Sequence, residues 1–564
     1  MLESGSKASV VRLRPVDARA NAGWRGERPP LYLVATLLLV AALVVPLHLG
    51  LQDVVDINES QRLLPPIEMA QRHDWVLPTI DGELYLTKPP LTYWIIGGAY
   101  ALLGSVAPLA GRAPVALVSL LTAAGVLAIG WRHANPHVGV WSALVLLSAF
   151  FFRVSAHEAE IDPFLAGAVL GMVYAQWRAA TDARWLRAAL VCGVAFGCGL
   201  LLKGPVVLPF LAAATVAIAL AARPNPRRLI AATAVATAVG FTIALPWVVL
   251  VARRVSFHVV SATLEAESVQ RIYAASRINS GPVYFYAAAL AAGFLPWTWM
   301  LALYAGRGPR AHARALSTSW FGVAGLFCLG SFVPFSLFAG KEVKYLLPLF
   351  PFMAILAGHA LDWLLRADDV TARRGARVAI SCWAVAGIGA LVAFLTPLGP
   401  WLRASPACSG LVIAGSAVCA LAFASTARHG RQISAALLVT GLTLAIVGVQ
   451  DALKVRRNAT KSPRMLIGEL TRVGRTGVPC YRFRVGRVGA YHLRELTRKL
   501  PDDTPPHRIP ALLPRPSAIV TRTSEAASVQ AGAAAAEATV AAVSGPYVLM
   551  VFLGPSLDGT GGAR

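Results

Sequence analysis

The sequence predicts an all-α polytopic membrane protein, with about thirteen transmembrane helices followed by a small C-terminal α/β domain. Composition is the first observation behind this fold class. Of 564 residues, 56% are hydrophobic and only 14% are charged, which is too apolar for an ordinary soluble enzyme. The second observation is that many windows of about 20 residues are almost free of charge, the length that a bilayer core requires.

The basic composition and the cysteines exclude other classes. A formal net charge of +24 would suggest nucleic acid binding in a soluble protein, but much of the Arg lies in short loops between apolar runs. That distribution is typical of the positive-inside rule and of attraction to anionic lipid. We therefore expect the lipid bilayer as a partner and no nucleic acid. The seven Cys form no CxxC motif, so we expect neither a disulfide framework nor structural zinc.

The first 30 residues carry several Arg and lead into a long apolar run without a small-residue cleavage site. We expect residues 1–30 to be a cytoplasmic tail before a retained first span. Residues 31–450 then form the predicted transmembrane domain. Its apolar runs fall at about 31–51, 91–107, 112–130, 138–154, 163–177, 187–202, 205–222, 229–251, 283–305, 320–338, 345–364, 378–397, 409–426 and 433–450.

The short Arg-bearing loops orient these runs. If the run at 91–107 is an interfacial or re-entrant piece and does not cross, these loops all lie on the side of the basic N-terminus. If that run crosses, the first four of them are turned outward, against the positive-inside rule. The first option gives about thirteen spans. It places a first loop at 52–111 and a large loop at 252–282 on the periplasmic face.

The composition changes after Gln450. Residues 451–564 contain the short β-prone runs VPCYRFRVG and YVLMVFLG between Arg-rich segments. The Ala-rich stretch 526–543 could form a helix. We expect a small periplasmic α/β domain, whose Arg residues either solvate a domain that rests on anionic lipid or help to bind an acidic substrate.

Candidate reactive carboxylates begin in the first loop. Asp56 and Glu59 are three residues apart, so a helix would place them on one face. Paired acids can act as a general base, bind a cation or orient a sugar hydroxyl, and the alternative is a solvated amphipathic helix on the membrane. Asp162 precedes Pro163 at the mouth of a span, where a charged group is a functional candidate. Its alternative role is to cap the helix that begins there.

Several short motifs follow one another in a fixed order along residues 68–348. They resemble those of the membrane glycosyltransferases that include the aminoarabinose transferases acting on lipid A and the protein-mannosyltransferase-like group. The resemblance covers residues 31–365 closely and the C-terminal domain loosely. The matching motifs are Glu68-Met69, His73-Asp74-Trp75, Gly82, Tyr85-Leu86, Lys88-Pro89-Pro90, Tyr93-Trp94, Arg112-Ala-Pro114, Glu160-Ile-Asp162-Pro163, Leu202-Lys203-Gly204-Pro205 and Lys341-Glu-Val-Lys344-Tyr345-Leu-Leu-Pro348.

The resemblance implies the GT-C fold and an inverting glycosyltransferase of the bacterial inner membrane. Such an enzyme takes a sugar from a polyprenyl-phosphate donor and passes it to lipid A, a glycan or a protein at the periplasmic face. Asp56, Glu59 and Asp162 are then the candidate catalytic carboxylates. Cationic and hydroxyl donors suit a lipid phosphate, and the positions that match the family's phosphate-binding groups, with two added lysines, are Tyr85, Lys88, Arg271, Tyr345, Lys203 and Lys344.

Two departures from the family pattern affect this expectation. Asn58 stands where the family has an aspartate, and an amide cannot accept a proton. Either Asp56 or Glu59 takes over, or the acceptor is already an anion such as a phosphate. Thr87 stands where aminoarabinose transferases carry a metal-binding Glu. We therefore expect no cofactor and no metal site, with a divalent cation left open, and we do not expect the aminoarabinose specificity to transfer.

A transporter or flippase of a lipid-linked envelope precursor is the alternative. Such proteins tend to carry charged groups near the middle of their spans and to show paired halves. Here the polar groups cluster towards one membrane face instead. That distribution favours an enzyme.

Overall fold

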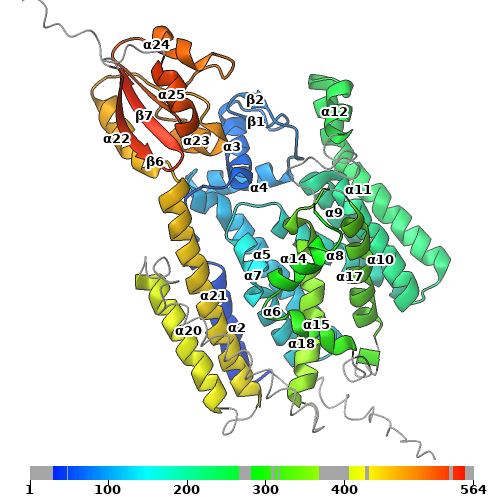
Figure 1. Ribbon diagram of the computed structural model, residues 1–564. Coiled ribbons are helices and arrows are strands. Elements are labelled where there is room, and N and C mark those ends of the chain that lie inside the picture. Colours follow the sequence, from blue (N-terminus) through cyan, green and yellow to red (C-terminus); the bar gives the residue numbers. More distant parts are fainter. Residues whose placement is uncertain are drawn as a thin grey trace, which may run out of the picture.

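The computed structural model describes residues 29–47, 49–265, 281–305, 310, 313–314, 318–338, 340–366, 406–425, 431–531 and 538–552. Within these ranges the protein is a bundle of apolar helices with a five-stranded sheet at one end (Figure 1). The predicted tail up to residue 28 and the predicted span at 378–397 lie outside the described residues.

The bundle is built from Ala-, Leu- and Val-rich helices that pack on one another with small residues at their crossings. Short 3-10 turns at Gly204–Val207 (η1), Leu303–Ala305 (η3) and Val343–Leu349 (η4) interrupt it. The helices are α2 (Leu31–Val44), α5 (Pro108–His133), α6 (Pro136–Ser148), α7 (Phe150–Ala156), α8 (Asp162–Thr181), α9 (Trp185–Lys203), α10 (Leu208–Ala221), α11 (Pro226–Arg254), α12 (Phe257–Leu264), α14 (Phe285–Gly293), α15 (Thr298–Ala302), α17 (Trp320–Leu337), α18 (Phe350–Arg366), α20 (Pro406–Ser425) and α21 (Arg431–Lys461).

The length and composition of these helices confirm a polytopic membrane protein. In the described part of the chain, six helical segments are long and apolar enough to cross a membrane, or up to 7 if α6 and α7, which meet at 69°, form one span. The run predicted to stay at the interface forms α4 (Leu91–Leu103), whose 13 residues are fewer than the about 20 that a span needs. It lies at the end of the bundle that carries the sheet (Figure 1).

The first loop forms a helix and a hairpin. Helix α3 (Ile57–Gln71) begins at Asp56, whose carboxylate accepts a hydrogen bond from the Asn58 amide at 2.7 Å, a typical N-cap. Strands β1 (Thr79–Ile80) and β2 (Glu83–Leu84) then pair in antiparallel fashion. The two residues between them have positive φ, 57° at Asp81 and 81° at Gly82, as a tight hairpin turn requires.

The C-terminal residues form a mixed sheet with strand order β4-β3-β5-β7-β6. Strand β3 pairs in parallel with β4 and β5, whereas β7 pairs in antiparallel fashion with β5 and β6. The helices and strands of this C-terminal region are α22 (Arg464–Arg475), β3 (Cys480–Arg482), α23 (Gly486–Leu493), β4 (Arg498–Lys499), η6 (Pro506–Arg508), α24 (Ile509–Leu512), β5 (Ser517–Arg522), α25 (Thr523–Ala531), β6 (Ala538–Ser544) and β7 (Tyr547–Phe552).

Two features of this region differ from a simple reading of the sequence. The helix expected over 526–543 is wrong in its second half, because α25 ends at Ala531 and residues 538–544 form β6. Pairing with β7, interrupted by one irregularity between Val540 and Ala542, outweighs the helix propensity of the alanines in β6. In addition, α21 runs unbroken past Gln450 to Lys461, so the change in composition lies inside a helix that leads from the bundle to the sheet (Figure 1).

A glycine at the crossing of α18 and α6 provides a test of the packing. A Cβ atom added to Gly358 would lie 2.6 Å from the backbone nitrogen of Ser142, whereas one added to Gly325 on α17 would meet nothing within 4 Å. We expect Gly358→Leu to abolish most of the folded protein recovered from membranes and Gly325→Leu to leave it within about twofold. Size-exclusion chromatography in detergent measures both, and equal recovery would contradict this packing.

Candidate active site

A buried pocket lies where the first loop meets the ends of several bundle helices. Its walls come from α3, the segment between β2 and α4, the turn before α8, the end of α9 and η4. Its volume is about 70 Å³, which corresponds to about five water molecules. This is room for a phosphate group and not for a whole lipid-linked sugar.

Several of the residues predicted from the sequence meet in this pocket, although they come from distant parts of the chain. Lys344 lies behind it, in an ion pair with Glu160. Arg271 lies outside the described residues, and neither Asp56 nor Glu59 lines the pocket. The predicted residues that do line it are Tyr85, Lys88, Asp162, Lys203 and Tyr345.

The cation Lys203 links two of these groups. Its ammonium forms an ion pair with the Asp162 carboxylate, and both side chains are almost fully buried. Its Nζ also lies 4.6 Å from the centre of the Tyr345 ring, within the range of a cation–π contact. Asp162 is the first residue of α8, whose N-cap is Ile161, so its carboxylate positions Lys203 and does not cap the helix.

Arg62 is a pocket residue that the sequence analysis missed. Only 4% of it is exposed, and its Nε has no hydrogen-bond partner among the described residues. Burial lowers its pKa, but nearby Tyr93, Tyr85 and Glu160 outweigh burial and raise that pKa above its ordinary value. The guanidinium is thus a buried cation with a donor to spare. The signal was available, because Asn58, Gln61 and Arg62 have i, i+3 and i+4 spacing on one helical face.

The turn before α8 brings acidic side chains to the pocket at alternate positions. Glu160 lines the pocket, and Glu158 lies 3.8 Å from the ammonium of Lys344. Burial raises the pKa of Glu158 to about 7; Lys344 opposes this rise, and the charge of Glu160 adds to it. Carboxylates thus lie beside the cations at this site, and Lys344 pairs with two of them.

Glu342, a second missed residue, is the unengaged carboxylate of the pocket. It is half-buried and lines the cavity, and its side chain has neither a hydrogen bond nor an ion pair within the described part of the chain. The neighbouring carboxylates are paired, Glu160 with Lys344 and Asp162 with Lys203. In the sequence, Glu342 stands between two lysines and ahead of Tyr345, where nothing marks it as reactive.

Glu59, predicted as catalytic, lies instead in a buried ion pair. Its two oxygens accept hydrogen bonds from Arg112 Nε and Nη2 at 2.7 and 2.9 Å, and Oε1 also accepts one from the Ala159 amide at 3.0 Å. Both partners are fully buried. Arg112 donates further to the carbonyls of Leu49 and Gln52. Because both oxygens of Glu59 are engaged here, its observed role is structural.

This ion pair makes a stability prediction. Removing one partner leaves an uncompensated buried charge, so we expect Glu59→Ala and Arg112→Ala each to cost about 3–5 kcal/mol. The double variant should cost less than the sum of the two. Thermal unfolding in detergent measures all three. A Glu59→Gln protein that keeps its thermal stability and loses activity would instead restore a catalytic role.

Relatives of known activity match about half of this chain. Residues 87–251 match the family model of dolichyl-phosphate-mannose-protein mannosyltransferases. The undecaprenyl phosphate-alpha-4-amino-4-deoxy-L-arabinose arabinosyl transferase of Pseudomonas aeruginosa (strain LESB58) is 30% identical over 317 residues, 54% of each chain. The protein of the same name from Edwardsiella ictaluri is 26% identical over 352 residues, 59% of each chain. The match thus spans little more than half the length of these relatives.

Solved structures extend the likeness to nearly the whole chain. The crystal structure of ArnT from Cupriavidus metallidurans bound to undecaprenyl phosphate superposes with a TM-score of 0.73 at 22% identity, covering 93% of this chain and 99% of that one. The chain has the ArnT fold. This confirms the resemblance predicted from the sequence motifs. The ArnT fold, the apolar helices and the bacterial relatives together indicate a multi-pass protein of a bacterial inner membrane.

Proposed function

We propose that this chain is a membrane glycosyltransferase, which transfers a sugar from a polyprenyl-phosphate donor to an envelope acceptor such as lipid A, another glycan or a protein. The observation that carries the proposal is the convergence of Arg62, Lys88 and Lys203 with two tyrosines in one buried pocket. The relatives support the donor class, since the names of the arabinosyl transferases specify undecaprenyl phosphate.

The proposed topology has about thirteen spans, a cytoplasmic N-terminus and a periplasmic active site. Residues 451–564 form the periplasmic domain, and the loops at 52–111 and 252–282 lie on the same face. In support of this arrangement, the sheet and the first loop share one end of the bundle (Figure 1). The Arg-bearing turn between α8 and α9 follows Thr181, at the far end of α8 from the pocket.

The proposed chemistry is a direct displacement at the anomeric carbon, with inversion. An acceptor oxygen forms the new bond as the bond from the sugar to the lipid phosphate breaks, and negative charge develops on that phosphate. Preorganised cations and hydroxyls stabilise such charge strongly in a dry site. Arg62, Lys88 and Lys203 would supply the cations, and Tyr85 and Tyr345 would supply hydroxyls. Lys344 and Arg271 stay proposed contributors.

The acceptor side of the reaction would use Glu342 and Asn58. Glu342 is the candidate to receive the acceptor proton, because its side chain makes no hydrogen bond or ion pair within the described residues; Lys203 acts on it only electrostatically. Asn58 can donate a hydrogen bond to the acceptor without changing charge. Asp56, as the α3 cap, and Glu59, as the partner of Arg112, would position this helix. The proposed steps use only side chains of this chain.

Lys88 tests the function. We expect Lys88→Ala to lower sugar transfer from a purified polyprenyl-phosphate donor by about 100-fold, the usual loss when one donor to a developing oxyanion is removed. Lys461→Ala, at an exposed site at the end of α21, is the control and should stay within twofold. The assay follows labelled sugar in detergent, where no gradient exists, so it also separates an enzyme from a transporter. Full activity of a correctly inserted Lys88→Ala protein would refute the proposal.

Glu342 tests the proposed base. Glu342→Gln keeps the size of the side chain and removes its basicity, so kcat should fall by about 100-fold or more, while KM for the donor changes little. Glu342→Asp should recover part of the activity. Steady-state kinetics with a fixed acceptor measure both. Unchanged kcat in Glu342→Gln would show that the acceptor needs no base and enters as an anion.

A further inference from the structure

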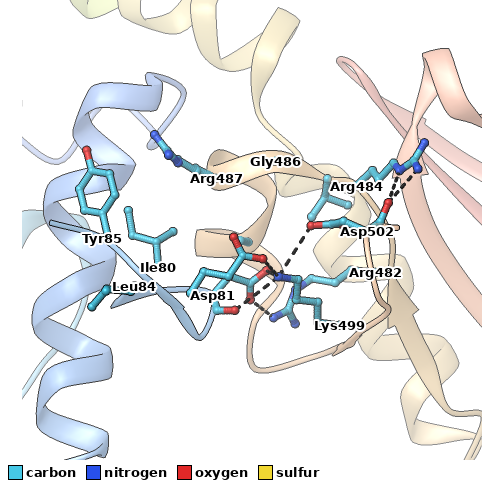
Figure 2. Close-up of a pocket in the computed structure, with 13 residues that line it drawn as sticks. Ile80, Asp81, Leu84, Tyr85, Arg482, Arg484, Gly486, Arg487, Lys499 and Asp502 are labelled. Carbon is cyan, nitrogen blue, oxygen red and sulfur yellow. Dashed lines mark hydrogen bonds and ion pairs between the residues drawn. The ribbon is translucent and has the colours of Figure 1, made fainter. Parts of the chain in front are cut away.

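A second cavity lies between the β1–β2 hairpin and the C-terminal domain (Figure 2). Its volume is about 210 Å³, and α23 and the residues around β3 and β4 form its far wall. Tyr85 lines this cavity and also the buried pocket around Lys88 and Lys203, the proposed site of the donor phosphate (the donor pocket). The two sites are therefore separated by one side chain.

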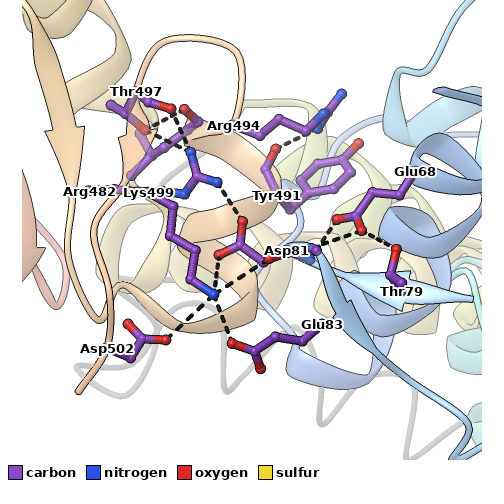
Figure 3. A network of polar contacts seen from close by, with 12 residues as sticks. Glu68, Thr79, Asp81, Glu83, Arg482, Tyr491, Arg494, Thr497, Lys499 and Asp502 are labelled. Carbon is purple, nitrogen blue, oxygen red and sulfur yellow. Dashed lines mark hydrogen bonds and ion pairs between the residues drawn. The ribbon is translucent and has the colours of Figure 1, made fainter. Parts of the chain in front are cut away.

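The carboxylates of this cavity are already neutralised. Arg482 binds Asp81 at 2.5 Å, and the Lys499 ammonium lies 2.9 Å from Glu83 and 3.7 Å from Asp502. Figure 3 shows Arg482 and Lys499 of the domain in contact with Asp81 and Glu83 of the hairpin. They leave no carboxylate of the cavity free to pair with a further cation.

One cation of the cavity has no anionic partner. Arg487 is exposed, and within the described residues it has neither a hydrogen bond nor an ion pair. Its guanidinium lies 5.0 Å from the centre of the Tyr85 ring and points from the start of α23 towards that ring (Figure 2). Stacking on an aromatic face orients a guanidinium while leaving its edge available to an anion.

Three neighbouring features add to the positive potential. Arg482 is only 7% exposed, and its Nε has no hydrogen-bond partner among the described residues. The guanidinium of Arg522 lies against Gly486, where an added Cβ would collide with it. Gly486 also begins α23, and the first amides of a helix attract anions. A buried unsatisfied donor, the exposed Arg487 and a helix start thus line one cavity, and Arg522 lies next to it against Gly486.

We propose that this cavity binds an anionic group, a phosphate or a carboxylate, of the sugar acceptor, with Arg487 as its main contact. The inference rests on the proposed glycosyl transfer and adds a place and a charge for the acceptor. Tyr85 explains the geometry. Its hydroxyl donates to Gln61 at 2.8 Å on the donor side, while its ring supports Arg487 on the other. An acceptor anchored there lies one aromatic ring away from the donor phosphate.

The first experiment measures binding without the reaction. Inorganic pyrophosphate is titrated by calorimetry into the full-length protein in a neutral detergent. To weaken binding in the donor pocket, the titrations use the Lys88→Ala background. We expect Arg487→Glu to weaken binding at least tenfold and Arg487→Lys to restore only part of it, because an ammonium keeps the charge but not the stacked, forked geometry. Arg498→Ala, an exposed Arg of the same domain that does not line the cavity, should change it less than twofold.

The second experiment measures transfer with Lys88 intact. Arg487→Glu should raise KM for the membrane acceptor at least tenfold, whereas the control Arg498→Ala should leave that KM within twofold. Lys88→Ala should instead lose transfer at every acceptor concentration, because Lys88 lines the donor pocket. Failure of the wild-type protein to use the donor would refute the proposed function without altering the binding result.

Three outcomes would overturn the acceptor subsite. Equal weakening by Arg487→Glu and Arg498→Ala would reduce the effect to general surface charge. Absence of pyrophosphate binding in the Lys88→Ala background would remove the site itself. Displacement of pyrophosphate by nanodiscs that contain phosphatidylglycerol, but not by those of phosphatidylcholine alone, would assign the cavity to bulk lipid headgroups.

Discussion

The buried ion pair between Glu59 and Arg112 is the constraint on which the candidate site depends. Moving two charges out of water costs several kcal/mol per ion, which only a complete set of partners can offset. Here the set is complete, because the Leu49 and Gln52 carbonyls and the Ala159 amide take up the remaining hydrogen bonds. The pair thereby ties the chain after α2, helix α3, helix α5 and the turn before α8 into one unit. Two walls of the candidate pocket, α3 and the turn before α8, belong to that unit.

Two of the lysines at the pocket form ion pairs with carboxylates. Lys203 faces Asp162, and Lys344 faces Glu160, so no strong unbalanced charge has to be held in a dry site. Two groups depart from this rule in a useful way: Arg62 has a donor without a hydrogen-bond partner among the described residues, and Glu342 has an unengaged carboxylate. The first suits a leaving phosphate, and the second suits an incoming hydroxyl.

The sequence predicted the fold and half of the pocket for physical reasons that can be named. Apolar runs and Arg distribution predict a membrane bundle, and charged residues at span ends must collect near a membrane surface. Lys88, Asp162 and Lys203 follow from that argument. The ion pair of Glu59 with Arg112 could not be predicted from the sequence, because the two residues are 53 positions apart and meet only through tertiary packing. Glu342 has no local pattern at all, and strand β6 was missed because alanine alternation carries almost no periodic signal.

Helix α21 leads from the bundle to the C-terminal sheet and so sets the position of that sheet. Its 31 residues extend for about 46 Å, of which about 30 Å would cross the hydrocarbon core, so the remainder is a rigid post under the domain. A continuous helix fixes the rotation of the domain about the helix axis as well as its distance from the bundle. Deleting one residue from it would turn everything above by about 100° and swing Arg487 off Tyr85. The placement of the C-terminal wall of the second cavity thus depends on the residue count of α21 as well as on the ion pairs that join the domain to the hairpin.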